Sequence, residues 1–347
     1  MRSISNMFFV DRADRDFDMN STERRLFTAL VMIALLIAVG YFATMATAVF
    51  AANEKPAAKL RAFANAEQAM SDFAAAIASG TLADLRSMLG PEGDAILKSG
   101  DPVEDKDARE RFAAAYADSH KLEFRNDSMA WIVVGKDGWP FPIPVVKRGA
   151  SWYFDAKAGR KELLNRRIGR NELHTMQAVL AFVDAQQEYY LRNPENDSLL
   201  HYAQMFISTP GKRDGLYFPT KAGENPSPLG PLFDARRAQG YVPLEGGKPG
   251  PYHGYYYKIL KAQGSQAPGG SYNYVVNGKM IGGFALVAYP AMYGNSGVMT
   301  FLVNHDGVLY EKDLGPDTIA IVQKMTRFNP DDTWSRESAP GRLSKLY

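Results

Sequence analysis

The feature that most constrains this chain is an apolar run without any acidic or basic residue, from Leu26 to Asn53, directly after Arg24 and Arg25. The run is long enough to cross the hydrocarbon core of a bilayer, which is roughly 30 Å thick. Paired arginines before such a run favour the cytoplasmic side and direct the following chain outward. The sequence therefore predicts an exported protein whose body is periplasmic or faces outward in the cell envelope.

Two interpretations of this segment are open. Val49-Phe50-Ala51 fits the small-residue cleavage pattern of a secretory signal peptide, whereas the length of the run favours an uncleaved membrane anchor. Arg24 and Arg25 also partly resemble a twin-arginine signal, but Glu23 precedes them and ordinary secretion fits the strong hydrophobicity better. We expect residues 1–25 to be a cytoplasmic n-region and residues 26–52 a signal peptide or anchor.

Composition restricts the remaining chain. With 347 residues and 46% hydrophobic content, the chain can bury one or two cores. A formal net charge of +2 gives no large positive field, so we expect no nucleic-acid partner. The absence of cysteine excludes disulfides, thiol catalysis and cysteine-ligated metals.

Residues 53–158 have the pattern of an α+β module. Apolar residues at helical spacing predict a helix up to Gly80, a short helix after Thr81 and a third helix from about Asp105. Three aromatic and β-branched runs then predict antiparallel strands over 129–134, 141–147 and 151–155. Prolines 140, 142 and 144 remove ladder donors, so we expect the middle strand to be an edge or bulged strand. This order resembles the cone-shaped fold of nuclear transport factor 2, a similarity of shape that implies no function.

One long connecting helix or two abutting helices are predicted over 159–190, with a break expected at Gly169 and a basic group from Arg160 to Arg170. Residues 191–330 then predict a second α+β module, with a short helix in 230–240 and a tail over 331–347. Its antiparallel strands are expected over 254–260, 282–288, 298–304 and 308–312.

Several strings in this part of the chain resemble those of a bacterial family of exported proteins that is described only as a domain of unknown function. They are Arg166 to Leu173, Gly240 to Pro243, Pro251 to Tyr256, Gly282 to Ala288 and Tyr310 to Gly315. The resemblance covers nearly all of the chain after the apolar run, and it implies no established activity.

Within this resemblance, the second module is similar to the globular part of type IV pilins and pseudopilins. The corresponding pieces are Ala185-Gln186 with Tyr189, Gly254 to Tyr257, Gly297 to Phe301 and Asp306-Gly307. Pilins carry the helix at their N-terminus after a short leader, whereas a whole module precedes it here. A pilin-like fold used for another purpose therefore fits better than a polymerising pilus subunit.

Catalytic and metal-binding patterns are weak. The five histidines form no pair with metal-ligand spacing, and no serine lies in a nucleophile elbow. We therefore predict no metal site and no cofactor, and we assign no catalytic residue.

Three groups remain as candidate binding residues. Trp131, Trp139 and Trp152 suit the wall of an apolar or sugar pocket in the first module, with core packing as the alternative. Tyr252, His253, Tyr255 and Tyr256 suit a glycan- or protein-binding surface, with a half-buried strand as the alternative. Arg166, Arg167 and Arg170 suit contact with an anion, with pairing to nearby acids as the alternative.

Three functions follow from these patterns. The first is a non-enzymatic binding or assembly module of the envelope, whose partner is an envelope protein or a cell-wall component. The second is a periplasmic hydrolase or isomerase that uses an aromatic-lined pocket in the first module. The third is a pseudopilin-like accessory of a secretion system. The residues leave the ligand and the oligomeric state open.

Overall fold

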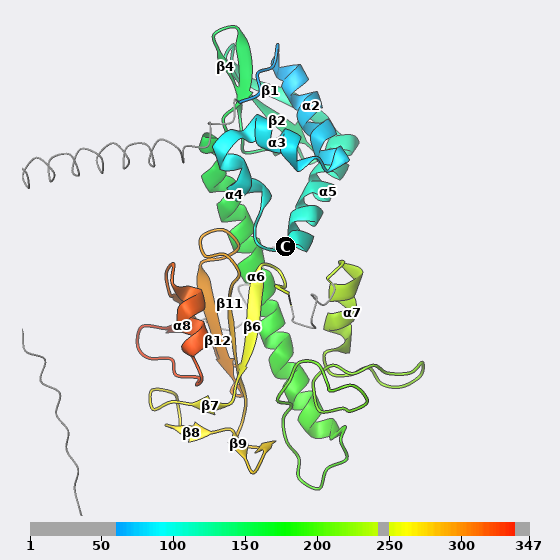
Figure 1. Ribbon diagram of the computed structural model, residues 1–347, viewed down its shortest axis with the longest axis vertical. Coiled ribbons are helices and arrows are strands. Elements are labelled where there is room, and N and C mark those ends of the chain that lie inside the picture. The colour runs from blue at the N-terminus through cyan, green and yellow to red at the C-terminus, as the bar shows by residue number, and fades with distance from the viewer. Residues whose placement is uncertain (1–59, 242–249, 337–347) are drawn as a thin grey trace, which may run out of the picture. The chain divides into compact units, whose positions relative to one another are not determined.

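The computed structural model describes residues 60–241 and 250–336 (Figure 1). The predicted n-region and the predicted signal peptide or anchor lie outside these residues. Among the helices that the structure describes, none combines the length and the apolar character that crossing a bilayer requires.

The first half combines helices with one antiparallel sheet, as the α+β prediction stated. Its helices are α2 Ala66–Ser79, α3 Leu82–Leu89, the short 3-10 helix η1 Gly90–Glu92, α4 Gly93–Leu97 and α5 Pro102–Asp118. Its strands are β1 His120–Asn126, β2 Met129–Val134, β3 Trp139–Pro140, β4 Val145–Arg148 and β5 Ser151–Phe154. The sheet order is β1-β2-β4-β5. Strand β3 pairs with Val133 and Val134 of β2, beyond the residues of β2 that pair with β4.

Local capping explains where the first helices begin and end. The Asn65 side chain accepts a hydrogen bond from the backbone of Gln68, and Gly80 ends α2 in the left-handed conformation. In α5, Asp101 caps the first turn and Pro102 occupies the first helical position. The third helix therefore begins before Asp105, where the sequence pattern had placed its start.

Two strand predictions in this half were wrong. Residues 141–147 do not form one strand, because Pro142 and Pro144 separate β3 from β4 and the ladder begins only at Val145. Of the two predicted forms, an edge strand is wrong, since β4 pairs with β2 on one side and β5 on the other. The pairing with β2 is interrupted at the prolines. Strand β1 was not predicted. Leu122 and Phe124 alternate with charged residues, but this alternation is short and most of the side chains are exposed.

A single helix, α6 Ala156–Arg192, joins the two halves (Figure 1). The predicted break at Gly169 is wrong. A single glycine in a helix interior costs only about 1 kcal/mol, and α6 is held on both sides of it by contacts with η1 and α4 and with β11 and β12. Gly159 has a different role, because a Cβ there would lie 2.5 Å from the Pro142 carbonyl oxygen.

The second half is also α+β. Its elements are α7 Gly230–Ala238, β6 Tyr255–Leu260, β7 Ala262–Gln263, β8 Tyr272–Asn273, β9 Val275–Val276, β10 Lys279–Met280, β11 Ala285–Pro290, β12 Met299–Asn304, β13 Leu309–Asp313, α8 Thr318–Lys324 and β14 Ser335–Arg336. The main sheet has the order β14-β13-β12-β11-β6. Because β14 pairs with β13, the sheet extends past the predicted domain boundary at residue 330.

The main sheet lies between α6 and α8. Tyr257 on β6 donates a hydrogen bond to Thr175 of α6, whereas the ammonium group of the next residue, Lys258, donates to carbonyls at the end of α8. Successive side chains of a strand point to opposite faces, so the two helices cover opposite faces. Each half has its own hydrophobic core in the described chain, one around Phe73 and Phe154 and one around Phe284 and Phe301.

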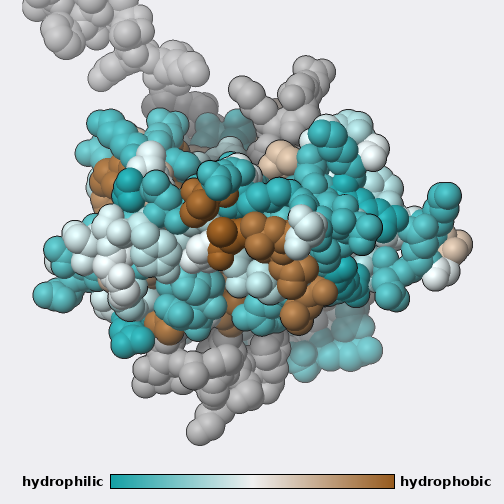
Figure 2. All heavy atoms as spheres, turned by 90° about the horizontal axis from the view of Figure 1, so that it is seen from below, coloured by the Kyte–Doolittle hydropathy of each residue, from teal (hydrophilic) through white to brown (hydrophobic). Residues whose placement is uncertain are grey.

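Apolar side chains also reach the surface of the second half. Figure 2 shows the molecule from the end where β8 and β9 lie in Figure 1, and a band of apolar atoms crosses a mostly polar face. Exposed apolar side chains near the end of α6 and the small strands are Leu191, Leu199, Leu200, Val276 and Ile281. This band is the main apolar feature of the surface in that view.

Candidate functional site

The junction between the two halves is organised around the N-terminus of α5. One carboxylate oxygen of Asp101 caps the helix by accepting from the backbone of Val103 and Glu104. Its other oxygen accepts from the Tyr241 hydroxyl at 2.8 Å and from the Gly254 backbone N–H at 2.9 Å. A single buried carboxylate thus holds both the first helix turn and two segments of the second half.

Gly254 is required at this junction for two reasons. Its φ of +74° lies in the left-handed region, and a Cβ would lie 2.6 Å from Asn171 Nδ2. The Asn171 amide itself donates to the Ser296 carbonyl at 2.9 Å. No side chain larger than hydrogen fits between α6, the 296 loop and Asp101.

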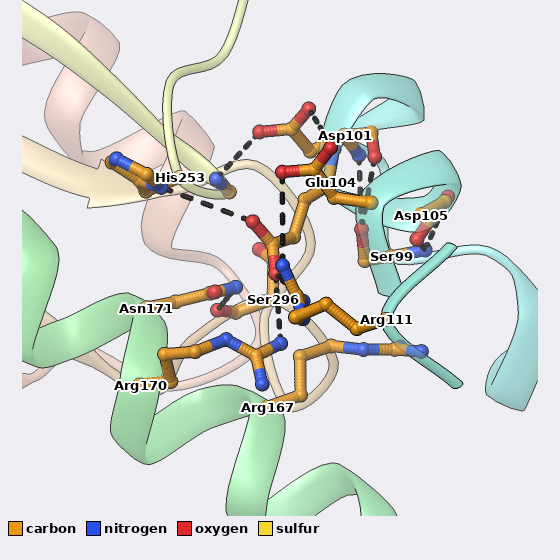
Figure 3. Close-up of polar contacts among 12 residues, drawn as sticks. Ser99, Asp101, Glu104, Asp105, Arg111, Arg167, Arg170, Asn171, His253 and Ser296 are labelled. Carbon is orange, nitrogen blue, oxygen red and sulfur yellow. Dashed lines mark hydrogen bonds and ion pairs between the residues drawn. The ribbon is translucent and has the colours of Figure 1, made fainter. Parts of the chain in front are cut away.

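Glu104 is the centre of a buried ion cluster (Figure 3). Its side chain is only 5% exposed, and its Oε1 accepts hydrogen bonds from Arg111 at 2.9 Å and Arg170 at 2.8 Å. The other oxygen lies 3.8 Å from Nδ1 of His253, which is too long for a hydrogen bond. Burial raises the pKa of Glu104, but the imidazole of His253 and the two guanidinium groups outweigh it and lower the pKa to about 2. Glu104 is therefore an ion-pair anchor at neutral pH.

Arg167 ties α6 to both halves. Its guanidinium donates to the carbonyls of Ala95 and Ile96 in α4 and to the side chain of Asn295 in the second half. Asn295 in turn donates to the Lys98 carbonyl at 2.8 Å. Burial lowers the pKa of Arg167, and these hydrogen bonds offset part of the cost of removing its charge from water.

Two imidazoles meet beside Glu104. The rings of His174 and His253 are 4.3 Å apart. Burial and the neighbouring His253 lower the pKa of His174, which keeps it neutral near pH 7. Among the described residues, Nδ1 of both histidines and Nε of Arg170 are buried without a hydrogen-bond partner in the chain. The cluster thus combines strong ion pairs with incompletely satisfied polar atoms.

A cavity of about 410 Å³ lies in the first half, next to this cluster. Its inner walls are apolar and aromatic, and include Phe73, Ile77, Leu89, Phe112, Val134 and Phe141. Phe73, Phe112 and Phe141 also pack against one another in the core, with ring centroids 5.1 to 5.6 Å apart. The cavity is therefore built on rigid, packed aromatic side chains and has the size of a small-molecule site.

Arginines line the same cavity on the side of α5 and α6. They are Arg109, Arg111, Arg166, Arg167 and Arg170. The Arg166 guanidinium lies over the ring of Trp139, 5.2 Å from its centroid, and both side chains are partly exposed. The cavity thus reaches solvent near Arg166 and Trp139, and its lining combines apolar and cationic side chains.

The structure separates the three predicted tryptophans. Trp139 lines the cavity and is 39% exposed. Trp152 is buried in the core, where it pairs with Phe63 and contacts Phe124. Trp131 is half-buried on β2 opposite Glu123, and neither it nor Trp152 is among the described residues that line the cavity.

The structure also distributes the predicted tyrosine group. Tyr252 and Tyr255 are buried, and the Tyr255 hydroxyl donates to the Met299 carbonyl at 3.0 Å. His253 joins the Glu104 cluster. Tyr256 is half-buried and lines a second cavity of about 460 Å³ between α7, α6 and β6. The group therefore belongs to the junction and to this second cavity rather than to one exposed patch.

All three predicted anion-contact arginines, Arg166, Arg167 and Arg170, line the first cavity. The sequence patterns missed Asp101, Glu104, Asn295 and the role of Tyr241. The family resemblance did point to this region. Three of the strings that carried it meet at the junction around Asp101 and Glu104: the string from Arg166 to Leu173, the string with Tyr241 and the string with His253 and Gly254.

No group of three or more histidine and carboxylate side chains suited to a metal ion occurs within residues 60–241 and 250–336. What remains is an apolar cavity with a cationic side and a buried ion cluster behind it. Fold and site together define an α+β protein with a preformed small-molecule cavity.

Comparison with known families matches residues 60–336 to the family described as "Protein of unknown function (DUF2950)". The chain belongs to this family. Comparisons with curated proteins and with solved structures gave no match.

Proposed function

We propose that this protein is an exported binding protein of the cell envelope, whose first half holds a small ligand in its cavity. One observation carries the proposal: a cavity of about 410 Å³ whose walls are packed aromatic side chains of the core. Rigid walls reduce the ordering cost of binding. Export rests on the apolar run after Arg24 and Arg25.

Binding fits the site better than catalysis. The titratable cluster of Glu104, His174 and His253 lies outside the set of described residues that line the cavity. The Glu104 carboxylate is also occupied by Arg111 and Arg170. A general acid or base has to reach the reacting atoms, whereas these groups fix the junction between the halves.

A neutral apolar fluorophore tests the proposal. N-phenyl-1-naphthylamine should bind the full chain saturably at one site. Ala108 and Ala114 are both exposed on α5, but only Ala108 lines the cavity. Ala108→Trp should therefore abolish binding by filling the cavity, and Ala114→Trp should leave it unchanged. Equal binding by both variants would place the fluorophore elsewhere and refute the proposal.

A hydrolase or isomerase is the second candidate, and one observation favours it. Asp105 lines the cavity, and burial raises its pKa although the backbone N–H of Ser99 bonds its carboxylate. A carboxylate in this position has the properties of a general base. If a turnover assay on esters or ketones detects activity, Asp105→Asn should abolish it while fluorophore binding persists.

The same proposal includes a fold for each half. The first half is a cone of the nuclear transport factor 2 type. The second half is pilin-like, which is supported by the long helix α6 packed on an antiparallel sheet. The partner would be an envelope protein or a cell-wall component. N-terminal sequencing of the protein recovered from the envelope fraction distinguishes cleavage near Ala51 from an intact anchor. A pseudopilin-like accessory predicts co-purification with a secretion machine instead.

A further inference from the structure

The lining of the first cavity combines apolar and cationic side chains. Its inner part is bounded by side chains such as Phe73, Ile77 and Val134, which are buried in the hydrophobic core. Its lining also includes the side chains of five arginines on α5 and α6. Apolar walls bind a hydrocarbon group through removal of its surface from water, and guanidinium groups bind carboxylates and phosphates.

The cationic side is not fully neutralised by neighbouring acids. Glu104 is shared by Arg111 and Arg170, Glu162 pairs with Arg166, and Asp107 lies 3.6 Å from Arg111. Asp105 is the acidic residue among the described lining residues. Five arginines thus face four carboxylates, which leaves an excess of positive charge at the cavity.

Arg109 carries that excess. It lies on α5, lines the cavity and is half-buried. Among residues 60–241 and 250–336 its side chain forms no ion pair and no hydrogen bond. Arg166 is held over the Trp139 ring, so its guanidinium is fixed at the same cavity. An incoming anion would therefore meet a guanidinium that has no carboxylate to release.

We propose that the ligand of this cavity is a single-chain amphiphile with an anionic head group, a carboxylate or a phosphate monoester. The hydrocarbon chain occupies the aromatic inner part, and the head group binds at Arg109 and Arg166. This inference rests on the proposed binding function and adds the chemical class of the ligand. Binding makes and breaks no covalent bond.

The cavity size sets an expectation for chain length. A volume of about 410 Å³ is at the lower end of the range for small-molecule sites. Each methylene that becomes buried should tighten binding about fourfold. Across an alkyl series the affinity should rise with length and then stop rising, because further carbons remain in water once the cavity is full.

Head-group variation at constant chain length tests the proposal directly. Dodecanoate, dodecyl phosphate, dodecanol and dodecyltrimethylammonium are titrated into the full chain by calorimetry, each below its micelle concentration. We expect both anions to bind about tenfold or more tightly than the alcohol, since hydrogen bonds to charged groups add this much. The cation should bind more weakly than the alcohol. The two anions separate a carboxylate source from a phosphate source.

Charge variants locate the head group. Arg109→Gln should weaken dodecanoate binding about fivefold or more and leave dodecanol binding unchanged. Arg125 is an exposed arginine on β1 outside the cavity, and Arg125→Gln is the matched control that should change neither affinity. Ala108→Trp, compared with Ala114→Trp, should remove binding of every alkyl compound.

The outcomes distinguish the two proposals. If dodecanol binds as tightly as dodecanoate and Ala108→Trp removes both, the cavity binds ligands but the anionic class is wrong. If Arg109→Gln and Arg125→Gln weaken dodecanoate equally, the head group does not lie at Arg109. If no alkyl compound binds, or Ala108→Trp has no effect, both proposals fail.

Discussion

Removing the charge of Glu104 should destabilise the protein in a pH-dependent way. Glu104→Gln keeps the size of the side chain, but it deprives Arg111 and Arg170 of the carboxylate that accepts their hydrogen bonds. Glu104 is 5% exposed, so little water replaces the lost contact. The variant therefore measures the contribution of the ion cluster to the junction.

The magnitude follows from the pKa of Glu104. The pKa falls from 4.5 to about 2 on folding, and one unit corresponds to about 1.36 kcal/mol. Because the folded-state pKa is the lower one, the charged carboxylate stabilises the fold above pH 4.5 by about 3 kcal/mol. That stabilisation is lost as the pH falls from 4.5 to about 2.

Urea unfolding at pH 7 and at pH 2.5, followed by circular dichroism and tryptophan fluorescence, provides the assay. We expect Glu104→Gln to lower the free energy of unfolding by about 3 kcal/mol at pH 7 and by much less at pH 2.5. Glu110 is 61% exposed and pairs with Lys106, so Glu110→Gln should cost less than about 1 kcal/mol. A Glu104→Gln effect of the same size at both pH values would refute the reasoning. At pH 2.5 the carboxylate is protonated in the unfolded chain, so folding must ionise it, and this cost cancels most of the stabilisation.

Three further substitutions test the junction. Tyr241→Phe leaves one hydrogen bond of Asp101 unmade and should cost about 1–3 kcal/mol in urea unfolding at pH 7; no loss would mean that water replaces the hydroxyl. Gly254→Ala should lower the free energy of unfolding by at least about 2 kcal/mol more than Gly149→Ala. Both positions have positive φ, but of the two only Gly254 lacks room for a Cβ. Equal effects in the same assay would show that neighbouring residues move to accommodate the methyl group. Burial lowers the pKa of His174 below 6.5, so the unfolded chain takes up its proton first and stability falls as the pH drops through that value. The decrease in melting temperature between pH 7.5 and 5.5 should therefore be smaller in His174→Gln, and an unchanged decrease would contradict the role of burial.

The elements that could be predicted from the sequence are those with their own periodic pattern. Helix α2 buries apolar residues at helical spacing, and strands β2, β11 and β12 are short runs of mostly buried apolar and β-branched residues. Strand β1 is mostly exposed and alternates only over Leu122 and Phe124, so its full length depends on pairing with β2. The continuity of α6 past Gly169 likewise depends on packing of both of its ends, which the local sequence does not contain.

The candidate site was predicted in part for the same reason. Arg166 and Arg170 stand out as a basic group on one helix, and both line the cavity. Their partners are distant in sequence: Glu104 lies 66 positions before Arg170, and Asp101 lies 153 positions before Gly254. A carboxylate that pairs across such separations has no local pattern to distinguish it from a surface acid.

The tryptophans show the opposite error, in which residues of one type were grouped although their strands direct them apart. Trp139 and Trp152 both lie in the same sheet. Trp152 faces Phe63 in the core, whereas Trp139 lies under Arg166 at the cavity. Treating the tryptophans as one group assumes that they point to the same face of the sheet. Which face a side chain takes depends on the register of its strand, and the prolines before β4 alter that register.

The cavity and the ion cluster of Glu104 share two residues, and this explains the form of both. Arg111 and Arg170 line the cavity and also bind Glu104. Glu104 therefore fixes two of the cavity's guanidinium groups before any ligand arrives, which lowers the entropy lost on binding. The same pairing neutralises part of their charge, so the charge available to a ligand comes mainly from Arg109. An anion that recruited Arg170 would have to compete with a buried carboxylate, whereas one that binds Arg109 leaves the junction intact. The arginines of the cavity can thus bind a ligand while two of them keep their ion pairs with Glu104 at the junction.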